Sequence, residues 1–359
     1  MRVLVVNAGS SSLKLRVLDP GDGVGAEADI DAPRARVDED ALRAWIAGAG
    51  TVDAVGHRIV HGGERFRSAV RVDDGVVGEL RALTDLAPLH QPKSLAALDA
   101  VLAALPDTPA VACFDTAFHA TLAPEATTYA VPRAWRERWG VRRYGFHGLS
   151  HAYASRRAAE LTGARRVVTA HLGAGASLAA VRDGRSVDTT MGFTPLEGLV
   201  MATRSGSVDP GLLLWLLERE RLDIAEMSAA LEHEGGLLAL AGTADMREVL
   251  ARADAGDDEA RVALGVYLHR LRAGIAAMAA ALGGLDALVF TGGVGERSPP
   301  VRAAAADGLG FLGVAVDTGR NGAPDGDADV SADGVAVRTL VVPAREDVEI
   351  ARQVRALLR

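Results

Sequence analysis

RVLVVNAGSSSLKLRV (residues 2–17) has a counterpart in the middle of the chain, RVVTAHLGAGASLAAV (residues 166–181). In both stretches an apolar strand runs into a turn of small residues, and Ser-Leu then opens a second strand. A strand–turn–strand unit that occurs twice indicates two similar domains, with chance similarity of two Val- and Ala-rich hairpins as the alternative. Both turns are suited to phosphate, because ligands of α/β folds bind where strand ends and their turns converge.

Short apolar runs alternate with longer amphipathic stretches along the rest of the chain. Further strands are predicted in residues 53–63, 110–115 and 286–293, and helices in residues 40–49, 94–105, 151–163, 211–220 and 260–283. This alternation predicts an α/β architecture. Residues 317–334 are rich in Gly and Asp and lack periodicity, so they are predicted to form a surface loop.

The composition of the 359 residues excludes several function classes. The net charge of −8 argues against nucleic acid as a partner, because phosphate backbones bind basic surfaces. The single cysteine, Cys113, excludes an internal disulfide and suits a reducing cytoplasm. No signal peptide is recognisable, and the longest apolar stretch, residues 273–290, is interrupted by glycines and Asp286. We therefore expect a soluble cytoplasmic protein without a membrane partner.

Three polar residues lie at or near the ends of predicted strands. Lys14 closes NAGSSSLK (residues 7–14), which is either a phosphate-binding turn or an exposed hairpin. Arg58 lies in GHRIVHGG (residues 56–63), where it is either an anion receptor or half of a buried ion pair. Asp115 follows an apolar strand, which places a carboxylate at that strand's carboxyl end.

Other candidate residues lie in turns that precede helices. His147 precedes one helix in a spacing that matches no zinc signature, and Arg204 lies in a Thr/Ser/Gly turn suited to an anion. VFTGGVGERS (residues 289–298) is a glycine-rich turn suited to a nucleotide, although no GxxxxGK[ST] loop occurs. Glu346 and Asp347 follow a strand at a helix start, where they either hold a metal ion or cap the helix.

Taken together and in order, these motifs resemble those of the acetate kinase family in the actin-like, sugar-kinase-like phosphotransferase superfamily. The matching stretches are NAGSSSLK, GHRIVHGG, LAPLH, FDTAFH, YGFHG, HLGAG, MGFTPLEG, TRSG, GTADMRE, FTGGVGE and PARED. The resemblance implies duplicated ribonuclease H-like (actin-like ATPase) domains with a nucleotide cleft between them. The first would comprise residues 1–148, with the C-terminal helix 347–359 packing back on it. The second, residues 149–346, would bind nucleotide and form a homodimer.

The family's activity is reversible, direct in-line transfer of the γ-phosphoryl group of ATP to acetate, which gives acetyl phosphate and ADP. The resemblance implies Mg²⁺ as the cofactor, with Mn²⁺ able to replace it, and acetate or propionate with ATP as substrates. An acceptor carboxylate is already ionised at pH 7, so we expect Asp115 to position magnesium or substrate rather than move a proton.

The resemblance assigns roles position by position. Asp115, His147, Arg204 and Arg58 correspond to catalytic residues, and Asn7 and Glu346 to magnesium-associated residues. The substrate pocket corresponds to Arg58, Val60, Leu89, His90 and Pro195. The nucleotide-binding residues correspond to Lys14, His171, Leu172, Gly173, Ala174, Gly175, Asp245, Met246, Arg247, Gly293, Val294, Gly295, Glu296 and Arg297.

This chain departs from the family pattern at several positions. Ala174 replaces the asparagine of HLGNG, which removes a side-chain donor near the transferred phosphate, and Ser207 replaces the aspartate of RSGD. Gln91, Leu149, Ala202 and Arg345 also differ from the usual residues. Three functions therefore remain open: an acetate kinase, a propionate or other short-chain acyl kinase, and a catalytically weakened or non-catalytic nucleotide-binding protein.

Overall fold

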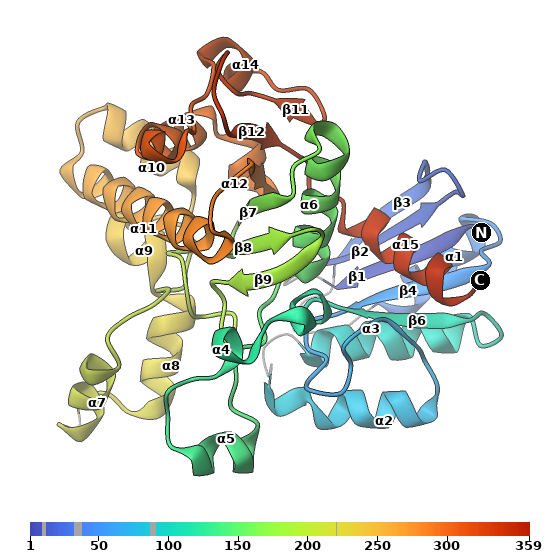
Figure 1. The fold of residues 1–359 in the computed structure, drawn as a ribbon. Coiled ribbons are helices and arrows are strands. Elements are labelled where there is room, and N and C mark those ends of the chain that lie inside the picture. The colour runs from blue at the N-terminus through green and yellow to red at the C-terminus, as the bar shows by residue number, and fades with distance from the viewer. Residues whose placement is uncertain (9–11, 32–37, 87–90, 220) are drawn as a thin grey trace. The chain divides into compact units, whose positions relative to one another are not determined.

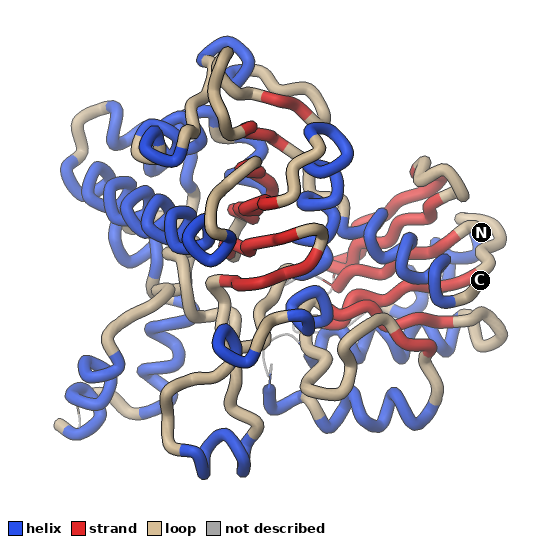
Figure 2. The backbone as a smooth tube through the Cα atoms, viewed as in Figure 1, coloured by secondary structure: helices blue, strands red, loops and turns tan. Residues whose placement is uncertain are grey.

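The protein is an α/β protein, and its computed structural model describes residues 1–8, 12–31, 38–86, 91–219 and 221–359 (Figure 1). The chain forms two compact units. Unit 1 contains Met1–Ala120, Phe146–Tyr153 and Arg345–Arg359, and unit 2 contains Thr121–Gly145 and Ala154–Ala344. In each unit the strands lie side by side and helices flank them (Figure 2). The sequence-based domain limits, residues 1–148 and 149–346, stay a prediction.

The sheet of unit 1 has six strands. They are β1 (Val3–Ala8), β2 (Ser12–Leu18), β3 (Val24–Asp31), β4 (Ala54–Ile59), β5 (Val70–Arg71) and β6 (Ala110–Phe114), in the order β3-β2-β1-β4-β6-β5. β1 is antiparallel to β2 and parallel to β4, and β4 is parallel to β6. The carboxyl ends of β1, β4 and β6 therefore lie at one edge of the sheet.

The sheet of unit 2 repeats this plan. Its strands are β7 (Arg166–Leu172), β8 (Ala176–Arg182), β9 (Arg185–Thr189), β10 (Ala287–Thr291), β11 (Ala328–Asp329) and β12 (Arg338–Val341), in the order β9-β8-β7-β10-β12-β11. β7 is antiparallel to β8 and parallel to β10, and β10 is parallel to β12. Strand order and directions match those of unit 1, so the predicted duplication is confirmed and the alternative of chance similarity is wrong.

Helices cover both faces of the unit 1 sheet. α1 (Glu39–Gly48), α2 (Asp74–Ala82) and α3 (Gln91–Ala104) lie on one face, where Leu4, Val6 and Val55 join the core with residues of α1 and α3. α15 (Glu346–Leu357) packs on β1 and β4 from the other face. Gly56 allows this close approach, because a Cβ there would lie 2.5 Å from a methyl carbon of Ile350. α6 (Gly148–Thr162) runs from unit 1 into unit 2.

The long helix α11 (Asp258–Leu282) organises unit 2 by packing on β7, β8 and β9. It begins at the cap Asp257 and ends at Gly283, which has the left-handed φ of 67° that favours glycine. The other helices are α4 (Pro124–Thr127), α5 (Arg133–Trp139), α7 (Pro210–Glu218), α8 (Ile224–His233), α9 (Gly236–Ala241), α10 (Met246–Asp254), α12 (Gly292–Arg297), α13 (Pro299–Asp307) and α14 (Thr318–Gly322).

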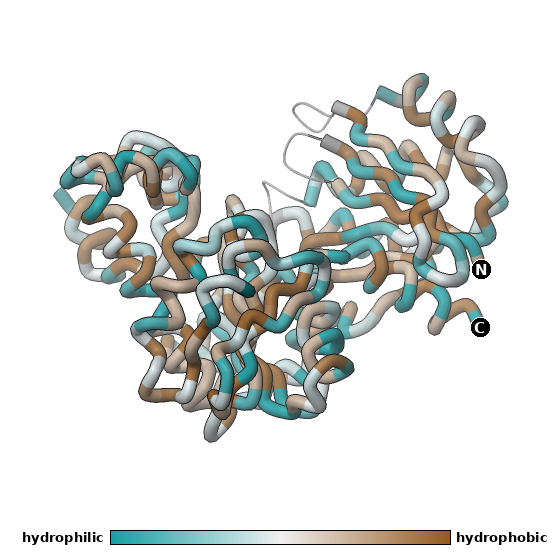
Figure 3. Tube along the Cα trace, turned by 90° about the horizontal axis from the view of Figure 1, so that it is seen from above, coloured by the Kyte–Doolittle hydropathy of each residue, from teal (hydrophilic) through white to brown (hydrophobic). Residues whose placement is uncertain are grey.

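Hydropathy varies within single helical turns, as expected of helices with one apolar face (Figure 3). The apolar stretch 273–290 comprises the end of α11 and most of β10, so it forms a helix followed by a strand. In the described part of the chain, no helix has both the length and the hydropathy needed to cross a membrane.

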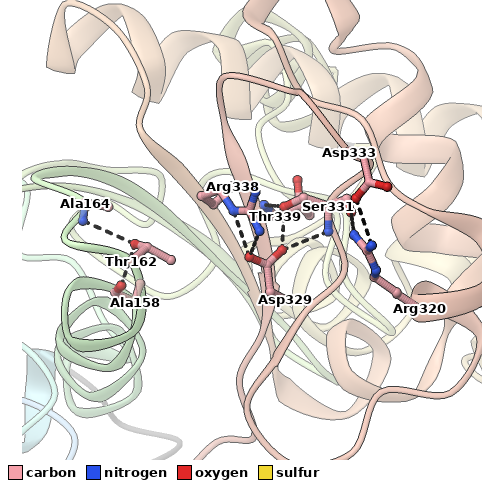
Figure 4. Close-up of polar contacts among 9 residues, drawn as sticks. All are labelled: Ala158, Thr162, Ala164, Arg320, Asp329, Ser331, Asp333, Arg338 and Thr339. Atoms are coloured by element: carbon pink, nitrogen blue, oxygen red, sulfur yellow. Dashed lines mark hydrogen bonds and ion pairs between the residues drawn. The ribbon is translucent and has the colours of Figure 1, made fainter.

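Residues 317–334, which were predicted to be a loop, contain two short regular elements. α14 is capped by Asp317, whose side chain accepts a backbone N–H of the first turn, and β11 pairs antiparallel with β12. Asp329 anchors this strand through hydrogen bonds to Ser331 Oγ at 2.6 Å and to the Arg338 guanidinium (Figure 4). The loop prediction is wrong here, because side-chain hydrogen bonds order a segment that lacks apolar periodicity.

Candidate functional site

Four of the predicted site residues meet at the carboxyl edge of the unit 1 sheet. Asn7 lies at the end of β1, Arg58 near the end of β4, and Asp115 directly after β6. Glu346 is the first residue of α15, which packs on the same sheet. Parallel strands place their carboxyl ends together, so residues far apart in the sequence become neighbours here.

Arg58 is the centre of this cluster. Its Nη2 lies 2.6 Å from Asp115 Oδ2 and its Nε lies 3.2 Å from Asp115 Oδ1. The two residues therefore form a bidentate ion pair. Its Nη1 donates to Asn7 Oδ1 at 3.1 Å, and Asn7 Nδ2 donates to Glu346 Oε2 at 2.9 Å. Arg58 Nε also lies 3.8 Å from Glu346 Oε2. Of the two readings left open for Arg58, the structure contains the ion pair, which leaves anion binding untested.

Burial shifts the pKa values of the charged residues in this cluster. It raises the pKa of Asp115, whose side chain is 1% exposed, while the adjacent Arg58 guanidinium acts in the opposite direction. Burial also lowers the pKa of Arg58, but Asp115 and Glu346 outweigh it and the net shift is upward. One permanently charged guanidinium is therefore held between two carboxylates.

Two further predicted residues lie near this edge of unit 1. Lys14 is exposed and faces Asn7 across the β1–β2 pair, where directly opposite residues share one face of a sheet. Val60 follows β4 and is 5% exposed. The rest of the NAGSSSLK turn, residues 9–11, lies outside the described residues, as do the predicted substrate residues Leu89 and His90.

The loop that carries His147 is held against Asp115 by the backbone. His147 has a φ of 55°, which is uncommon for a residue other than glycine. The following N–H, of Gly148, donates to Asp115 O at 3.0 Å, and a Cβ at Gly148 would collide with that oxygen. His119 Nε2 lies 3.1 Å from Phe146 O, the carbonyl that precedes His147. The structure thus brings His147 into the same part of unit 1 as the Arg58–Asp115 pair.

Arg204 and Pro195 belong to unit 2. Burial lowers the pKa of Arg204, and Glu232 acts in the opposite direction. The turn that carries Pro195 is fastened by Glu197, whose carboxylate accepts hydrogen bonds from Tyr129 Oη and, at 2.6 Å, from Arg143 Nη2. Burial is also the largest cause of the raised pKa of Tyr129. Tyr129 and Arg143 were not predicted: Tyr129 lies in no motif, and Arg143 lies just before the motif YGFHG, whose neighbourhood could have indicated it.

A cavity of about 710 Å³ in unit 2 is lined by many of the predicted nucleotide-binding residues. Its volume lies within the ~300–1,000 Å³ typical of small-molecule sites. Eight of the predicted residues line it, from three separate segments: Gly173, Ala174, Asp245, Met246, Arg247, Gly293, Val294 and Arg297. His171, Leu172, Gly175, Gly295 and Glu296 lie in the same segments, and Leu172 and Gly295 are buried. Unit 2 therefore assembles both glycine turns around one cavity.

The cavity wall also contains residues that no motif identified. Leu237, Leu250 and Pro300 supply apolar surface suited to the flat faces of a nucleobase. Tyr267 and Ser298 line the cavity too, and within the described residues their buried hydroxyls have no hydrogen-bond partner. Leu250 follows Met246 by one helical turn, which could have indicated it. Tyr267 comes from the middle of α11, where nothing local distinguishes it.

The rim of the cavity carries an exposed ion pair at the start of α10. Asp245 caps this helix by accepting the Arg247 N–H at 2.9 Å, and its carboxylate lies 2.6 Å from Arg247 Nη2. These hydrogen bonds from Arg247 lower the pKa of Asp245 to about 2. Glu296, in contrast, turns its carboxylate to the Ala344 N–H at 2.9 Å.

The donors near Glu346 allow one kind of metal site. Among the described residues, no group of three or more His, Cys, Asp or Glu side chains is placed to hold a metal ion. Asn7 and Glu346 supply an amide and a carboxylate at one point of the cluster. Mg²⁺ is commonly bound by one or two carboxylates together with substrate phosphates and water, so the Glu346 carboxylate fits Mg²⁺ arriving with a phosphate ligand. Asn7 would have to release its Oδ1 from Arg58 to join it.

Two copies of one mixed six-stranded sheet define the duplicated ribonuclease H-like class of α/β proteins. The acetokinase family matches residues 36–352 of the chain. An acetate kinase of Leifsonia xyli subsp. xyli is 48% identical over 389 aligned residues, which cover 98% of this chain and 97% of that protein. The structure of Porphyromonas gingivalis acetate kinase matches with a TM-score of 0.91 and 35% identity, covering 100% of both chains. A propionate kinase from Francisella tularensis subsp. tularensis matches with a TM-score of 0.91 and 32% identity, covering 99% of each. The chain belongs to the acetokinase family.

Proposed function

We propose that this protein is an acetate kinase that transfers the γ-phosphoryl group of ATP to acetate, reversibly. The observation that carries the proposal is the cluster of Asn7, Arg58, Asp115 and Glu346 at one sheet edge. Family membership and the glycine-lined cavity of unit 2 support it. Propionate is the second candidate acceptor, because a propionate kinase structure matches nearly as well in identity.

The main obstacle to the proposed reaction is the repulsion between the acceptor carboxylate and the phosphate, and not the removal of a proton. An oxygen of the acceptor carboxylate forms a bond to the γ-phosphorus while the bond from that phosphorus to the β–γ bridging oxygen breaks, and ADP leaves. The acceptor is ionised at pH 7, so no proton has to be removed. Two like charges ~4 Å apart repel by about 4 kcal/mol at an effective dielectric constant near 20. Arg58, Arg204 and His147 are assigned to offset this repulsion.

Arg58 fits this task because Asp115 and Asn7 fix its guanidinium on two sides. A guanidinium held in place needs no reorganisation when charge develops on the transferred group. Asp115 is accordingly assigned a positioning role, toward Arg58 and the substrate. Val60 and Pro195, with Leu89 and His90, are assigned to the acyl group of the acceptor, and His147 and Arg204 to the transferred phosphoryl group.

The cavity of unit 2 is assigned to the nucleotide, with Lys14 as a further contact from unit 1. The glycines at positions 173 and 293 leave backbone exposed to a phosphate, and the apolar wall suits the base. Asn7 and Glu346 would hold Mg²⁺. When bound, that ion would neutralise phosphate charge and orient the phosphate oxygens.

The test is trapping of acyl phosphate with hydroxylamine in the presence of ATP, Mg²⁺ and one acid. We expect acyl hydroxamate from acetate, with a larger kcat/KM than from propionate or butyrate. A larger kcat/KM for propionate would replace acetate as the substrate. Binding of ATP without any acyl phosphate from the three acids would reject the kinase in favour of a non-catalytic nucleotide-binding protein.

Ala174 offers a gain-of-function prediction. It is exposed at the cavity wall, and its φ lies outside the left-handed region, so other side chains fit there. Removing one donor to a developing charge costs about 10²–10³ in rate, so we expect Ala174→Asn to raise kcat about 10-fold or more. Steady-state kinetics with saturating ATP and acetate measure this change.

Ala174→Leu is the matched control, because leucine has the same branched shape and number of heavy atoms as asparagine but no donor. We expect it to leave kcat unchanged or lower it. An equal rise in both variants would show that filling the wall, and not a new hydrogen bond, is responsible, and the proposed proximity of Ala174 to the transferred phosphate would be rejected.

We further propose that the protein is a cytoplasmic homodimer. Apolar side chains are exposed on α5 and α7, including Trp135, Trp139, Leu214 and Trp215, whose exposed fractions are 48–58%. A helix such as α7, with no buried residue, is typical of an element that is covered by a partner. The mass of the protein in solution tests the dimer.

A further inference from the structure

α12 carries the second glycine turn of the cavity and ends in an unusual way. Gly293, Val294 and Arg297 line the cavity from this helix, and Ser298 and Pro300 line it from the residues that follow. The last four carbonyls of a helix have no N–H partner within the helix, so residues that follow it or side chains must supply the donors. Gly295 and Glu296 are among these four, and the residues four positions later, Pro299 and Pro300, have no N–H to offer. Two carbonyls at the end of α12 therefore need other donors.

Arg302, one turn into α13, supplies these donors. Its Nη1 donates to Gly295 O at 2.9 Å and to Glu296 O at 2.7 Å. Its other donors are held by Asn321, with Nε donating to Oδ1 at 2.7 Å and Nη2 to the backbone O at 2.6 Å. Asn321 in turn donates to Pro299 O at 2.9 Å. The guanidinium thus ties the end of α12 to α13 and α14.

The environment of Arg302 is unusual for a charged residue. Its side chain is 0% exposed, and burial lowers its pKa. No carboxylate of the described residues pairs with it, so its hydrogen bonds go to three carbonyl oxygens and one amide oxygen. A guanidinium in this position costs free energy that an apolar side chain would not. A task that needs the planar fork of a guanidinium would account for this cost.

We propose that Arg302 is a positioning residue that sets nucleotide affinity by fixing the turn from Arg297 to Pro300. This inference rests on the proposed function, because it takes the cavity of unit 2 as the nucleotide site. The turn forms one wall of the cavity, and its backbone has no donors of its own at Pro299 and Pro300. Without Arg302, the C-terminal end of α12 and this wall would lose their fixed position relative to each other.

The test is calorimetric titration of ADP and ATP into the full-length protein and its variants. We expect Arg302→Met to raise the Kd of both nucleotides about 10-fold, as two buried carbonyls lose their donor. The KM for acetate should change less than about 2-fold, because the acceptor is assigned to other residues. Arg302→Lys, which keeps donors but loses the fork, should give an intermediate Kd. Asn321→Ala should also raise the Kd of both nucleotides. It is the variant to use if Arg302→Met does not fold.

Arg272→Met is the matched control. Arg272 is a half-buried arginine on α11 whose Nε donates to Ala304 O at 3.0 Å, and neither residue lines the cavity. We expect this control to lower Tm, though by less than Arg302→Met because Arg272 bonds one carbonyl only, and to leave nucleotide Kd unchanged. An unchanged Kd in Arg302→Met with a lowered Tm would overturn the inference and leave Arg302 a purely structural residue. Absence of nucleotide binding in the wild-type protein would instead overturn the proposed function.

Discussion

Replacing Arg58 with methionine is expected to lower kcat/KM for acyl phosphate formation by about 10³-fold, the low end of the effect of a guanidinium on phosphoryl transfer. Arg58 bonds Asp115 through two nitrogens and Asn7 through a third, so its loss frees two side chains at once. It also leaves the buried Asp115 carboxylate without its cation. Removing one partner of a buried pair typically destabilises a protein by about 3–5 kcal/mol. Kinetics and urea unfolding measure the two losses.

The double variant Arg58→Met, Asp115→Asn separates these losses. It removes the unpaired carboxylate, so we expect most of the free energy of unfolding to return while kcat/KM stays low. Recovery of activity together with stability would contradict the proposal, because it would make Arg58 a structural ion-pair partner and nothing more.

Asp115→Asn alone tests the positioning role of Asp115. The asparagine can still accept from Arg58, but it has no charge. We expect weaker Mg²⁺ or acetate binding and a pH–rate profile of unchanged shape, since no proton passes through Asp115. Unchanged affinities with a lower kcat and an altered pH profile would instead assign Asp115 as a general base.

The unit 1 cluster was predictable because its residues lie at strand ends. Asn7, Arg58 and Asp115 each interrupt or follow an apolar run, and the alternation of strands and helices makes those strands parallel neighbours. What the pattern leaves open is the partner of Arg58. The sequence around a buried arginine does not show whether its partner is a carboxylate or a ligand. Only the pairing of β4 with β6 in the sheet brings Asp115 next to Arg58.

The cavity wall was predictable only in part. Its glycine turns stand out in the sequence, although GGVGER forms the short helix α12 and not an open turn. That helix packs on β7 and β10, and Gly292 permits it, since a Cβ there would lie 2.8 Å from Leu172 O. Nothing in the sequence identified Tyr267 or Arg302 as a site residue, because each lies in a helix of ordinary composition. Their positions depend on long-range packing and, for Arg302, on two prolines that remove donors.

Acid is expected to destabilise this protein steeply, and His57 is a main cause. His57 lies on β4 and is 1% exposed, and within the described residues neither ring nitrogen has a hydrogen-bond partner. Burial lowers its pKa to about 3, and burial also lowers the pKa of His61 to about 4. Both pKa values are depressed in the folded state, so the unfolded chain binds more protons between these values and about 6.5.

The sign follows from this difference in bound protons. The stability that neutral His57 and His61 contribute is complete above pH ~6.5 and is lost as the pH falls toward their folded-state pKa values. Each histidine is expected to remove about 1.4 kcal/mol of unfolding free energy per pH unit in that window. Two of them would remove about 5 kcal/mol between pH 6.5 and 4.5, which is comparable with the whole stability of many domains. Urea unfolding at a series of pH values measures the slope.

His57→Leu keeps an apolar side chain of similar size at this position and has no titrating group. We expect it to lower the slope between pH 6.5 and 4.5 by about 1.4 kcal/mol per pH unit, whatever its effect on stability at pH 8. His269→Leu is the control, because His269 is exposed on α11 and should leave the slope unchanged. If His57→Leu keeps the wild-type slope of unfolding free energy against pH, then the His57 ring is protonated in the folded protein and has a partner that replaces its hydration. In that case the acid sensitivity would have to come from other groups whose pKa is lowered in the folded state, such as His61.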